Sequence, residues 1–496
     1  MMHSALWAAA LLASRALGVV GGNVGDAQLL AADFTAPQRA DFRGVSAVRH
    51  GFDFMAEEVY RGRTPELAQQ SIARMRDARL AAARTWYSAD WVMERGWGAG
   101  LNFSTPRFEQ WCEWLAATQA AGVDVVVTAG WWFTQNACAI GPPANCTPSD
   151  ASLAVYSDWI SQTAAELKRR GFSHASTFLL FTEPLSYESG IVPTGWNQTS
   201  YYLYAVRFLH NYMVARGTRS LVRFLAPNGD ADVAGVAACV AGLADIIDIW
   251  SSHDYSKPTY AAWLATFEAY TNITSRSAAA GRRAFWADEG GLNGEANRNA
   301  SDYGTYLALW QAALMNAGGS NSFLWLWEDQ YYVWPLENAT NSDSFDNGLH
   351  RWGLSYWLPD SADVRPAWYA FTILTRFLRA PAAAAAEALA TATVTGVGGG
   401  GAVIVAAVAG LPGGAAPGYR AFLLINEGAT QASVAVAVSG GSAEPLRRVS
   451  YNPAAPPRNG ATLVPPSGSP WPDSLQWLND TLAPREVAMW VSASGL

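Results

Sequence analysis

Two carboxylates in this sequence stand where a short apolar run gives way to a chain break. Glu183 occurs in Phe181-Thr182-Glu183-Pro184, and Glu289 occurs in Trp286-Ala287-Asp288-Glu289-Gly290-Gly291. A pair of facing carboxyl groups can divide its chemistry, because one group donates a proton while the other attacks carbon. The donor needs a raised pKa, which apolar surroundings and the charge of the second carboxylate supply. Whether the pair can act depends on elements that bring the two groups together.

The elements before and between these carboxylates alternate in type. Short β-branched or apolar runs, typical of strands, are separated by longer amphipathic stretches, typical of helices. The expected strands are Val45–His50, Ala82–Trp86, Asp124–Ala129, Ser176–Phe181, Leu221–Ala226, Ile246–Ser251, Ala284–Ala287 and Ser322–Trp327. The expected helices are Pro65–Arg79, Arg107–Ala121, Leu153–Gly171, Tyr201–Gly217, Tyr260–Ala280, Tyr303–Gly318 and Pro366–Arg379.

This alternation predicts parallel strands joined by crossover helices. The number of units and the length of the segment favour an α/β fold of the (β/α)8 TIM-barrel type, and a doubly wound sheet is the alternative. The chain after about residue 380 changes character. Short strand-like runs separated by Gly and Pro begin at residues 402, 420, 433, 448 and 486, and they predict an antiparallel β-sandwich. The segment 26–34 could add one strand to that sandwich.

Barrel enzymes carry their catalytic groups at the C-terminal ends of the strands. Glu183 follows the fourth expected strand and Glu289 the seventh, so both carboxylates should reach the same mouth. Such a pair meets the requirement of glycoside hydrolysis, in which the leaving oxygen is protonated and the anomeric carbon is attacked. Asp288 is the nearest rival to Glu289. Side chains alternate along a strand, so we expect only one of these two neighbours to reach the site.

With these motifs, the chain resembles the large clan of retaining glycoside hydrolases that have a (β/α)8 barrel. The resemblance covers the whole barrel, and the xylosidase-like and glucocerebrosidase-like branches also carry a C-terminal sandwich. The clan's acid/base motif is Asn-Glu-Pro, and Thr182-Glu183-Pro184 matches two of its three positions. The resemblance implies Glu183 as acid/base and Glu289 as nucleophile. Where the clan's Asn bonds the sugar 2-hydroxyl, Thr182 has a shorter reach and a single donor.

The resemblance also implies roles for residues at other strand ends. His253 and Tyr255 stand where the clan places side chains that touch the nucleophile or the sugar, and Arg84 stands where an Arg often bonds the nucleophile. Trp325 and Trp327 end the eighth expected strand, where the clan often keeps a Trp beneath the reactive sugar. Their spacing predicts that both share a face and that at least one reaches the mouth. Trp131 follows the third strand and Asn228 the fifth, so either could line the cleft.

Composition excludes several other classes of function. The formal net charge is −8, which argues against nucleic acid, whose binding needs clustered Lys and Arg. We find no zinc-type spacing of Cys and His and expect no metal. Gly396, Gly398 and Gly401 spell G-x-G-x-x-G, but a strand-like run follows instead of a helix, so we expect no nucleotide cofactor. No stretch after the N-terminus resembles a membrane span.

The N-terminus and the cysteines indicate export. Residues 1–22 resemble a secretory signal peptide, which predicts a barrel over residues 23–380 and a sandwich over residues 381–496. Of four Cys, Cys138 and Cys146 flank a short loop and are the first choice for a disulfide, although four free thiols are the alternative. Seven glycosylation sequons fit a glycoprotein that is secreted, wall-bound or vacuolar; they begin at Asn102, Asn145, Asn197, Asn272, Asn299, Asn338 and Asn479.

The sequence therefore predicts an exported retaining β-glycosidase whose partner is a carbohydrate substrate. Two alternatives stay open. A barrel without catalytic activity that binds carbohydrate would retain a glycan unchanged, and Thr182 is the residue that keeps this reading open. A transglycosylase would use the same residues but transfer the sugar to another sugar instead of water.

Overall fold

The computed structural model describes the barrel, most of its helices and most of the C-terminal strands. The residues it describes are 28–34, 37–48, 65–93, 100–129, 149–185, 196–229, 232–255, 257, 259–292, 295–331, 345–346, 349–356, 361–380, 387–397, 403–411, 413–439, 445–457, 467–471 and 477–492. Trp131, the expected signal peptide and the expected Cys138–Cys146 pair lie outside these ranges. Cys112 and Cys239 are buried free thiols.

Eight parallel strands close into a barrel, as the alternating pattern predicted. The strands are β3 (Gly44–Val48), β4 (Ala82–Tyr87), β5 (Asp124–Ala129), β6 (Thr177–Leu179), β7 (Arg223–Pro227), β8 (Ile249–Tyr255), β9 (Phe285–Gly291) and β10 (Asn321–Trp325). Each strand pairs with the next along the chain, and β10 closes the ring by pairing with β3. Buried residues dominate both faces of these strands because side chains fill the barrel inside and helices cover it outside.

The helices that surround the barrel begin at short polar caps. Thr105, Ser149, Asn197, Asp232 and Thr259 each accept a hydrogen bond from a backbone N–H of the first turn, which satisfies a donor that the helix leaves free. The helices are α3 (Pro65–Asp77), α4 (Pro106–Ala120), α6 (Asp150–Arg169), α7 (Gln198–Ala215), α8 (Val233–Leu243), α9 (Tyr260–Ile273), α10 (Glu295–Asn299), α11 (Tyr303–Asn316) and α12 (Ala367–Phe377). Short 3₁₀ turns cover Ala89–Trp91, Ser173–Ala175 and Arg219–Leu221.

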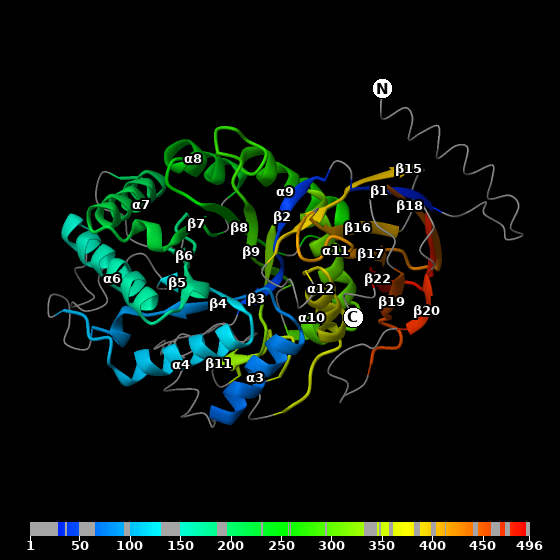
Figure 1. Cartoon of the computed structure of the whole chain (residues 1–496), viewed down its shortest axis with the longest axis horizontal. Helices are drawn as coiled ribbons and strands as arrows, with labels where there is room; N and C mark the ends of the chain where they lie inside the picture. Colours follow the sequence, from blue (N-terminus) through cyan, green and yellow to red (C-terminus); the bar gives the residue numbers. More distant parts are fainter. Residues whose placement is uncertain are drawn as a thin grey trace, which may run out of the picture.

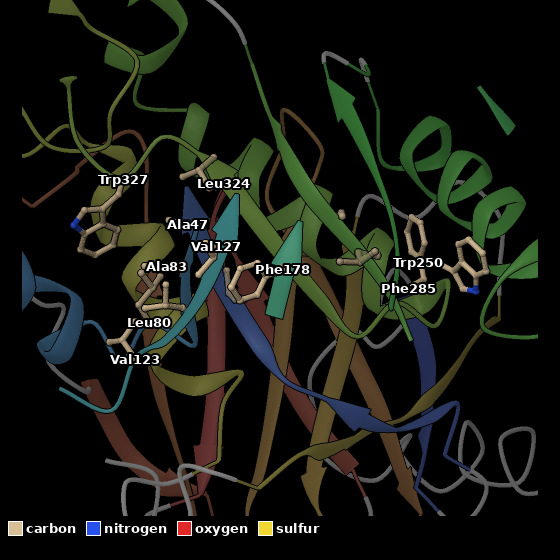
Figure 2. Packing of buried hydrophobic residues seen from close by; sticks show 14 of the residues in the cluster. Ala47, Leu80, Ala83, Val123, Val127, Phe178, Trp250, Phe285, Leu324 and Trp327 are labelled. Carbon is tan, nitrogen blue, oxygen red and sulfur yellow. The ribbon is translucent and has the colours of Figure 1, made fainter. Parts of the chain in front are cut away.

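Alternation along the barrel strands separates two cores. On β4, Ala82 and Trp86 point into the barrel and belong to its inner cluster, whereas Ala83 and Tyr87 point outward to the helices. Figure 2 shows the outward layer, with side chains such as Val127 and Phe178 beside neighbouring strands. Arg84 shares the inward parity of Ala82 and Trp86, so this strand carries a guanidinium inside the barrel.

Antiparallel strands form a sandwich beside the barrel. One sheet has the order β15-β1-β18-β21 and the other the order β2-β14-β16-β17-β22-β19-β20. These strands are β1 (Gln28–Asp33), β2 (Arg39–Phe42), β14 (Leu389–Thr391), β15 (Thr393–Val397), β16 (Val403–Gly410), β17 (Arg420–Asn426), β18 (Ala432–Ser439), β19 (Leu446–Tyr451), β20 (Ser467–Trp471), β21 (Trp477–Leu482) and β22 (Val487–Ser492). A further small sheet joins β11 (Gln330–Tyr331), β13 (Leu349–His350) and β12 (Phe345–Asp346).

Both ends of the chain build the sandwich. Strand β1 lies between β15 and β18, and β2 pairs with β14, so residues that precede the barrel complete both sheets. The sandwich is therefore not formed by residues 381–496 alone. The expected extra strand before the barrel is present as β1.

The sandwich packs on the barrel through helices α11 and α12, which Figure 1 shows between the two units. Asn316 on α11 donates to the carbonyl oxygen of Val405 on β16 over 2.9 Å, and the Tyr419 hydroxyl donates to the carbonyl oxygen of Phe377 over 2.5 Å. Apolar residues of the larger sheet also belong to the same cluster as the outer barrel residues. Among the described residues, no helix has both the length and the apolar character needed to cross a membrane.

Candidate active site

Glu289 lies within β9 and is held by three donors. The Arg84 guanidinium approaches its Oε2 atom at 2.7 Å, and His253 Nε2 lies 3.1 Å from the same oxygen. The Tyr255 hydroxyl donates to the other oxygen, Oε1. The Glu289 side chain is 8% exposed and that of Arg84 is 0% exposed, so the ion pair is shielded from water. The carboxylate is therefore fixed at both oxygens.

Arg84 is itself fixed at the barrel interior. Its Nη1 atom also donates to the carbonyl oxygen of Asp288 over 3.0 Å, and its Nε atom donates to Thr128 Oγ1 over 3.0 Å. The guanidinium lies 4.7 Å from the ring centre of Trp86, in cation–π contact. These contacts aim the guanidinium at Glu289.

Glu183 follows the short strand β6 in a turn. Its φ is 48°, in the left-handed region, and its backbone N–H donates to Asn228 Oδ1 over 3.2 Å. Gly229 backs this turn, because a Cβ atom there would lie 2.9 Å from the Glu183 Cα atom. Glu183 Oε1 lies 3.2 Å from His253 Nδ1, and the Glu183 side chain is 31% exposed. The turn thus presents this carboxyl group partly to solvent.

The separation between the two carboxylates is short. One oxygen of Glu183, one of Glu289 and a ring nitrogen of His253 all lie within 4.8 Å of one another. Three such atoms could meet a cation. However, Arg84 already neutralises Glu289 Oε2, and His253 uses both ring nitrogens in hydrogen-bonding contacts, so the arrangement suits hydrogen bonding better than metal binding.

The pKa values of the three groups shift because they are buried together. Burial raises the pKa of Glu289, and the charges of His253 and Arg84 offset this only in part. Burial also acts to raise the pKa of Glu183, but the hydrogen bond and charge of His253 outweigh it and leave the pKa below its ordinary value, which contradicts the expectation of a raised pKa for the proton donor. Burial acts to lower the pKa of His253, yet the charge of Glu289 and the hydrogen bond to Glu183 raise it to about 9. The two carboxylates therefore favour the protonated form of the imidazole.

Asp288 also joins this network, contrary to the expectation that only one of the two neighbours would reach the site. Its Oδ2 atom accepts a hydrogen bond from Asn228 Nδ2 over 2.5 Å. The register between β8 and β9 shifts here, since Ser252 pairs with Ala287 but His253 pairs with Glu289. The irregularity breaks strict alternation. Strand patterning alone gives no signal of such a shift.

The two tryptophans at the end of the eighth strand face different ways, which corrects the expectation that they share a face. Trp325 belongs to the inner barrel cluster, and its ring meets that of Trp86 edge to face at 5.9 Å. Trp327 instead packs on Trp368 of α12, at 4.6 Å between ring centres. Strand β10 ends at Trp325, so its alternation does not extend to Trp327.

The remaining sequence candidates are placed as follows. Asn228 is fully buried and contacts His253, Asp288 and Glu183, so it supports other side chains rather than lining a cleft. Thr182 is buried beside Glu183, and its contact with a sugar stays a prediction. Sequence reasoning gave no role to Thr128 and Trp86, which hold Arg84, and none to Glu328. Glu328 is buried and accepts a hydrogen bond from Ser71 over 2.9 Å.

Comparison with known proteins finds similar structures but no similar sequences. No protein-family model matches this sequence, and no curated protein sequence matches it. Solved structures do. The chain is similar to a glycoside hydrolase family 30 endoxylanase from Clostridium papyrosolvens, with a TM-score of 0.62 and 13% identity over 93% of this chain and 99% of that one. The two share a fold, a closed barrel of eight parallel strands with an antiparallel sandwich beside it.

Two further structures extend the likeness across families. The catalytic domain of a family 30 xylanase C from Talaromyces cellulolyticus gives a TM-score of 0.62 at 12% identity, covering 94% of this chain and 100% of that one. A family 51 arabinofuranosidase from Xanthomonas axonopodis pv. citri gives a TM-score of 0.57 at 12% identity, with the same two coverages. In each case the likeness spans barrel and sandwich together.

Proposed function

We propose that this protein is a retaining β-glycosidase that hydrolyses O-glycosidic bonds by double displacement. The carrying observation is the carboxylate pair, Glu183 and Glu289, at the ends of β6 and β9 with oxygens within 4.8 Å. Retaining enzymes hold their carboxyl groups about 5–5.5 Å apart, whereas inverting enzymes need about 6.5–9.5 Å to admit a water. The shared fold with xylanases and arabinofuranosidases supports a carbohydrate substrate.

The two carboxylates take different roles. Glu289 is the nucleophile: Arg84 and Tyr255 bind its two oxygens, which favours the ionised form and limits its movement. Glu183 is the acid/base, because its side chain is partly exposed where a leaving group departs and water enters. In the first step Glu183 gives a proton to the leaving oxygen while Glu289 bonds the anomeric carbon. In the second step Glu183 takes a proton from water, which displaces Glu289.

The test measures product release from a panel of β-linked aryl glycosides and oligosaccharides. Wild type should release sugar, and proton NMR of the first product should show the anomer of the substrate. Glu289→Gln and Glu183→Gln should lose activity by orders of magnitude, while Glu113→Gln, at an exposed position on α4, should not.

Each other outcome has a distinct meaning. Binding of a glycan without release would support the inactive-barrel alternative and make Thr182 the residue to explain. Longer oligosaccharides in place of free sugar would support transglycosylation. Release of the opposite anomer would contradict double displacement.

We also propose that the chain is exported and glycosylated. The apolar N-terminal run and the seven sequons support this. Expression in a secreting eukaryotic host should yield protein in the culture medium that lacks about the first twenty residues, because signal peptides are cleaved during export. Treatment with an N-glycan-removing enzyme should increase its mobility on a gel. Retention of the full N-terminus inside the cell would contradict export.

A further inference from the structure

His253 lies between the two carboxylates and touches both. Its Nδ1 atom is 3.2 Å from Glu183 Oε1, and its Nε2 atom is 3.1 Å from Glu289 Oε2. The ring is fully buried, so water does not compete for either nitrogen. A doubly protonated imidazole can donate to both carboxylates at once, whereas a neutral ring has one proton for two carboxylates.

The Nε2 atom faces two neighbours with opposite requirements. Asn228 Nδ2 lies 2.7 Å away and is a donor, because its amide is oriented by the Asp288 carboxylate and by the Glu183 N–H. Glu289 Oε2, at 3.1 Å, is an acceptor while the carboxylate is ionised. A bare Nε2 suits Asn228 and a protonated Nε2 suits ionised Glu289. Ionised Glu289 therefore stabilises the doubly protonated ring. When that charge is lost the whole ring becomes more acidic, and the proton that can leave is the one on Nδ1, because Nδ1 faces Glu183, a carboxylate that can accept it.

The other charged groups around the ring act in a known direction. Glu183 approaches from the turn after β6, and Asp288 and Glu289 approach from β9, with Asp288 Oδ1 3.9 Å from Nε2. All three favour the imidazolium. The positive charge of Arg84, on β4, disfavours the imidazolium, but Arg84 is paired with Glu289. The Tyr255 hydroxyl, on the same strand as His253, donates its hydrogen bond to Glu289. The balance raises the pKa of His253 to about 9, which favours the charged ring at neutral pH.

We propose that His253 stores the proton that Glu183 delivers to the leaving group, and that the charge of the nucleophile controls its release. The inference rests on the proposed function. As Glu289 bonds the anomeric carbon, it loses the negative charge that stabilises the imidazolium. The ring becomes more acidic when the leaving oxygen needs a proton, and the two events are thereby coupled.

The proton inventory of this step balances. The Nδ1–H bond breaks and a bond from that proton to Glu183 Oε1 forms, leaving a neutral imidazole that keeps its Nε2 proton. The carboxyl group of Glu183 then protonates the leaving oxygen as the glycosidic bond breaks. In the second half-reaction water gives a proton to Glu183, its oxygen displaces Glu289, and the returning negative charge draws the proton back to Nδ1.

A titration without turnover tests the coupling directly. The protein has six His, so the ¹⁵N signals of uniformly labelled imidazoles can be assigned by comparison with His253→Gln. In wild type we expect both nitrogens of His253 to show the imidazolium signature through neutral pH. In Glu289→Gln, whose side chain is neutral, we expect the titration of His253 to shift downward by about one pH unit or more.

The outcomes separate this inference from the proposed function. An unchanged His253 titration in Glu289→Gln would overturn the storage role even if the enzyme hydrolyses glycosides. A shifted titration in a protein that never releases sugar would uphold the charge coupling and contradict the glycosidase assignment instead.

Kinetics supply a second test that a merely structural role would not satisfy. His253→Gln should lower kcat/KM for alkyl glycosides by about 10²-fold or more, because their leaving oxygen needs a proton. Dinitrophenyl glycosides, whose leaving group needs no proton, should lose much less. The basic limb of the pH profile should move to lower pH, since Glu183 alone then holds the proton. His210→Gln, on α7, is the matched control, and equal losses on both substrates with an unmoved basic limb would contradict the proposal.

Discussion

The ends of β9 and β6 both carry a carboxylate but are built differently. Glu289 stands inside its strand, is 8% exposed and has donors on both oxygens. Glu183 stands beyond its strand in a left-handed turn, is 31% exposed and meets His253 at one oxygen. The first arrangement fixes a carboxyl group in one position. The second lets a group exchange protons with a leaving group and with water.

The contrast shows how a barrel can assign roles to two chemically identical side chains. A nucleophile benefits from fixed geometry, because its oxygen must reach one carbon. An acid/base must face both bulk water and the substrate oxygen, so partial exposure serves it. Strand position, rather than residue type, separates the roles here.

The largest loss of activity should come from removing each carboxylate, and added azide should replace part of its function. Glu289→Gly should lower kcat by an amount on the order of 10⁶-fold, and azide should restore cleavage of a dinitrophenyl glycoside with an inverted glycosyl azide as product. Glu183→Gly should lower turnover of poor leaving groups by about 10²–10⁴-fold, and azide should give the retained product. NMR of the azide products distinguishes the two variants, and exchanged stereochemistry would reverse the assigned roles.

The next effect should come from Arg84→Met, which removes the buried cation from Glu289. Loss of one preorganised charged donor should lower kcat/KM by about 10²–10³-fold on all substrates, including those with activated leaving groups. Steady-state kinetics on paired alkyl and dinitrophenyl glycosides measure this. Arg207→Met, at an exposed ion pair with Asp245, serves as the control. A loss confined to alkyl glycosides would show that Arg84 serves the acid instead of the nucleophile.

A smaller effect is expected from Tyr255→Phe, which removes one hydrogen bond to Glu289 Oε1. A hydrogen bond to a charged group contributes about 1.5–3 kcal/mol, so kcat/KM should fall about 10–100-fold. That bond lowers the pKa of Glu289, and its loss should raise the pKa further above the ordinary value. Glu289 must be ionised to attack, so the acid limb of the pH profile should move to higher pH. An unmoved acid limb would place the hydroxyl's role elsewhere.

Outside catalysis, a further effect should appear in the free energy of unfolding. His253 has a pKa of about 9 in the folded protein, against an ordinary value of about 6.5. Its contribution to the free energy of unfolding is therefore present below the ordinary pKa and is lost as pH rises through the folded one. Denaturant titrations of wild type and His253→Gln between pH 6 and about 9.5 should show the difference in unfolding free energy decreasing with pH. A difference that grows with pH would mean that the buried ring is neutral.

Much of the fold follows from sequence pattern, because parallel strands covered on both faces produce apolar runs that are easy to recognise. The expected Asp124–Ala129 matches β5 at both ends. The later strands begin or end differently. Strand β9 runs to Gly291 where Ala284–Ala287 was expected, because polar side chains can continue a strand at the barrel mouth. His253, Tyr255 and Glu289 therefore lie within strands, not after them.

The two carboxylates were recognisable from strand ends, and Arg84, His253 and Tyr255 were proposed from the family resemblance, but the contacts among them could not be predicted. The involvement of Asp288 depends on a register shift between β8 and β9. The shift arises when the two strands pair, so it cannot be predicted from the residues of either strand alone. The support of Arg84 by Thr128 and Trp86 depends on which residues face inward together. Such contacts are properties of tertiary packing, so single-sequence patterns miss them.

The pairing of β1 with β18 determines the order in which the barrel and the sandwich can fold during synthesis. Gln28 pairs with Val434, so the strand made early has its parallel partner only after the whole barrel has left the ribosome. Until then β1 and β2 present unpaired strand edges, which are prone to associate with other chains. The barrel can fold first, since its neighbouring strands and their helices follow one another along the chain. Closing the sandwich is then the slow, long-range event that ties the first strand to the last part of the chain.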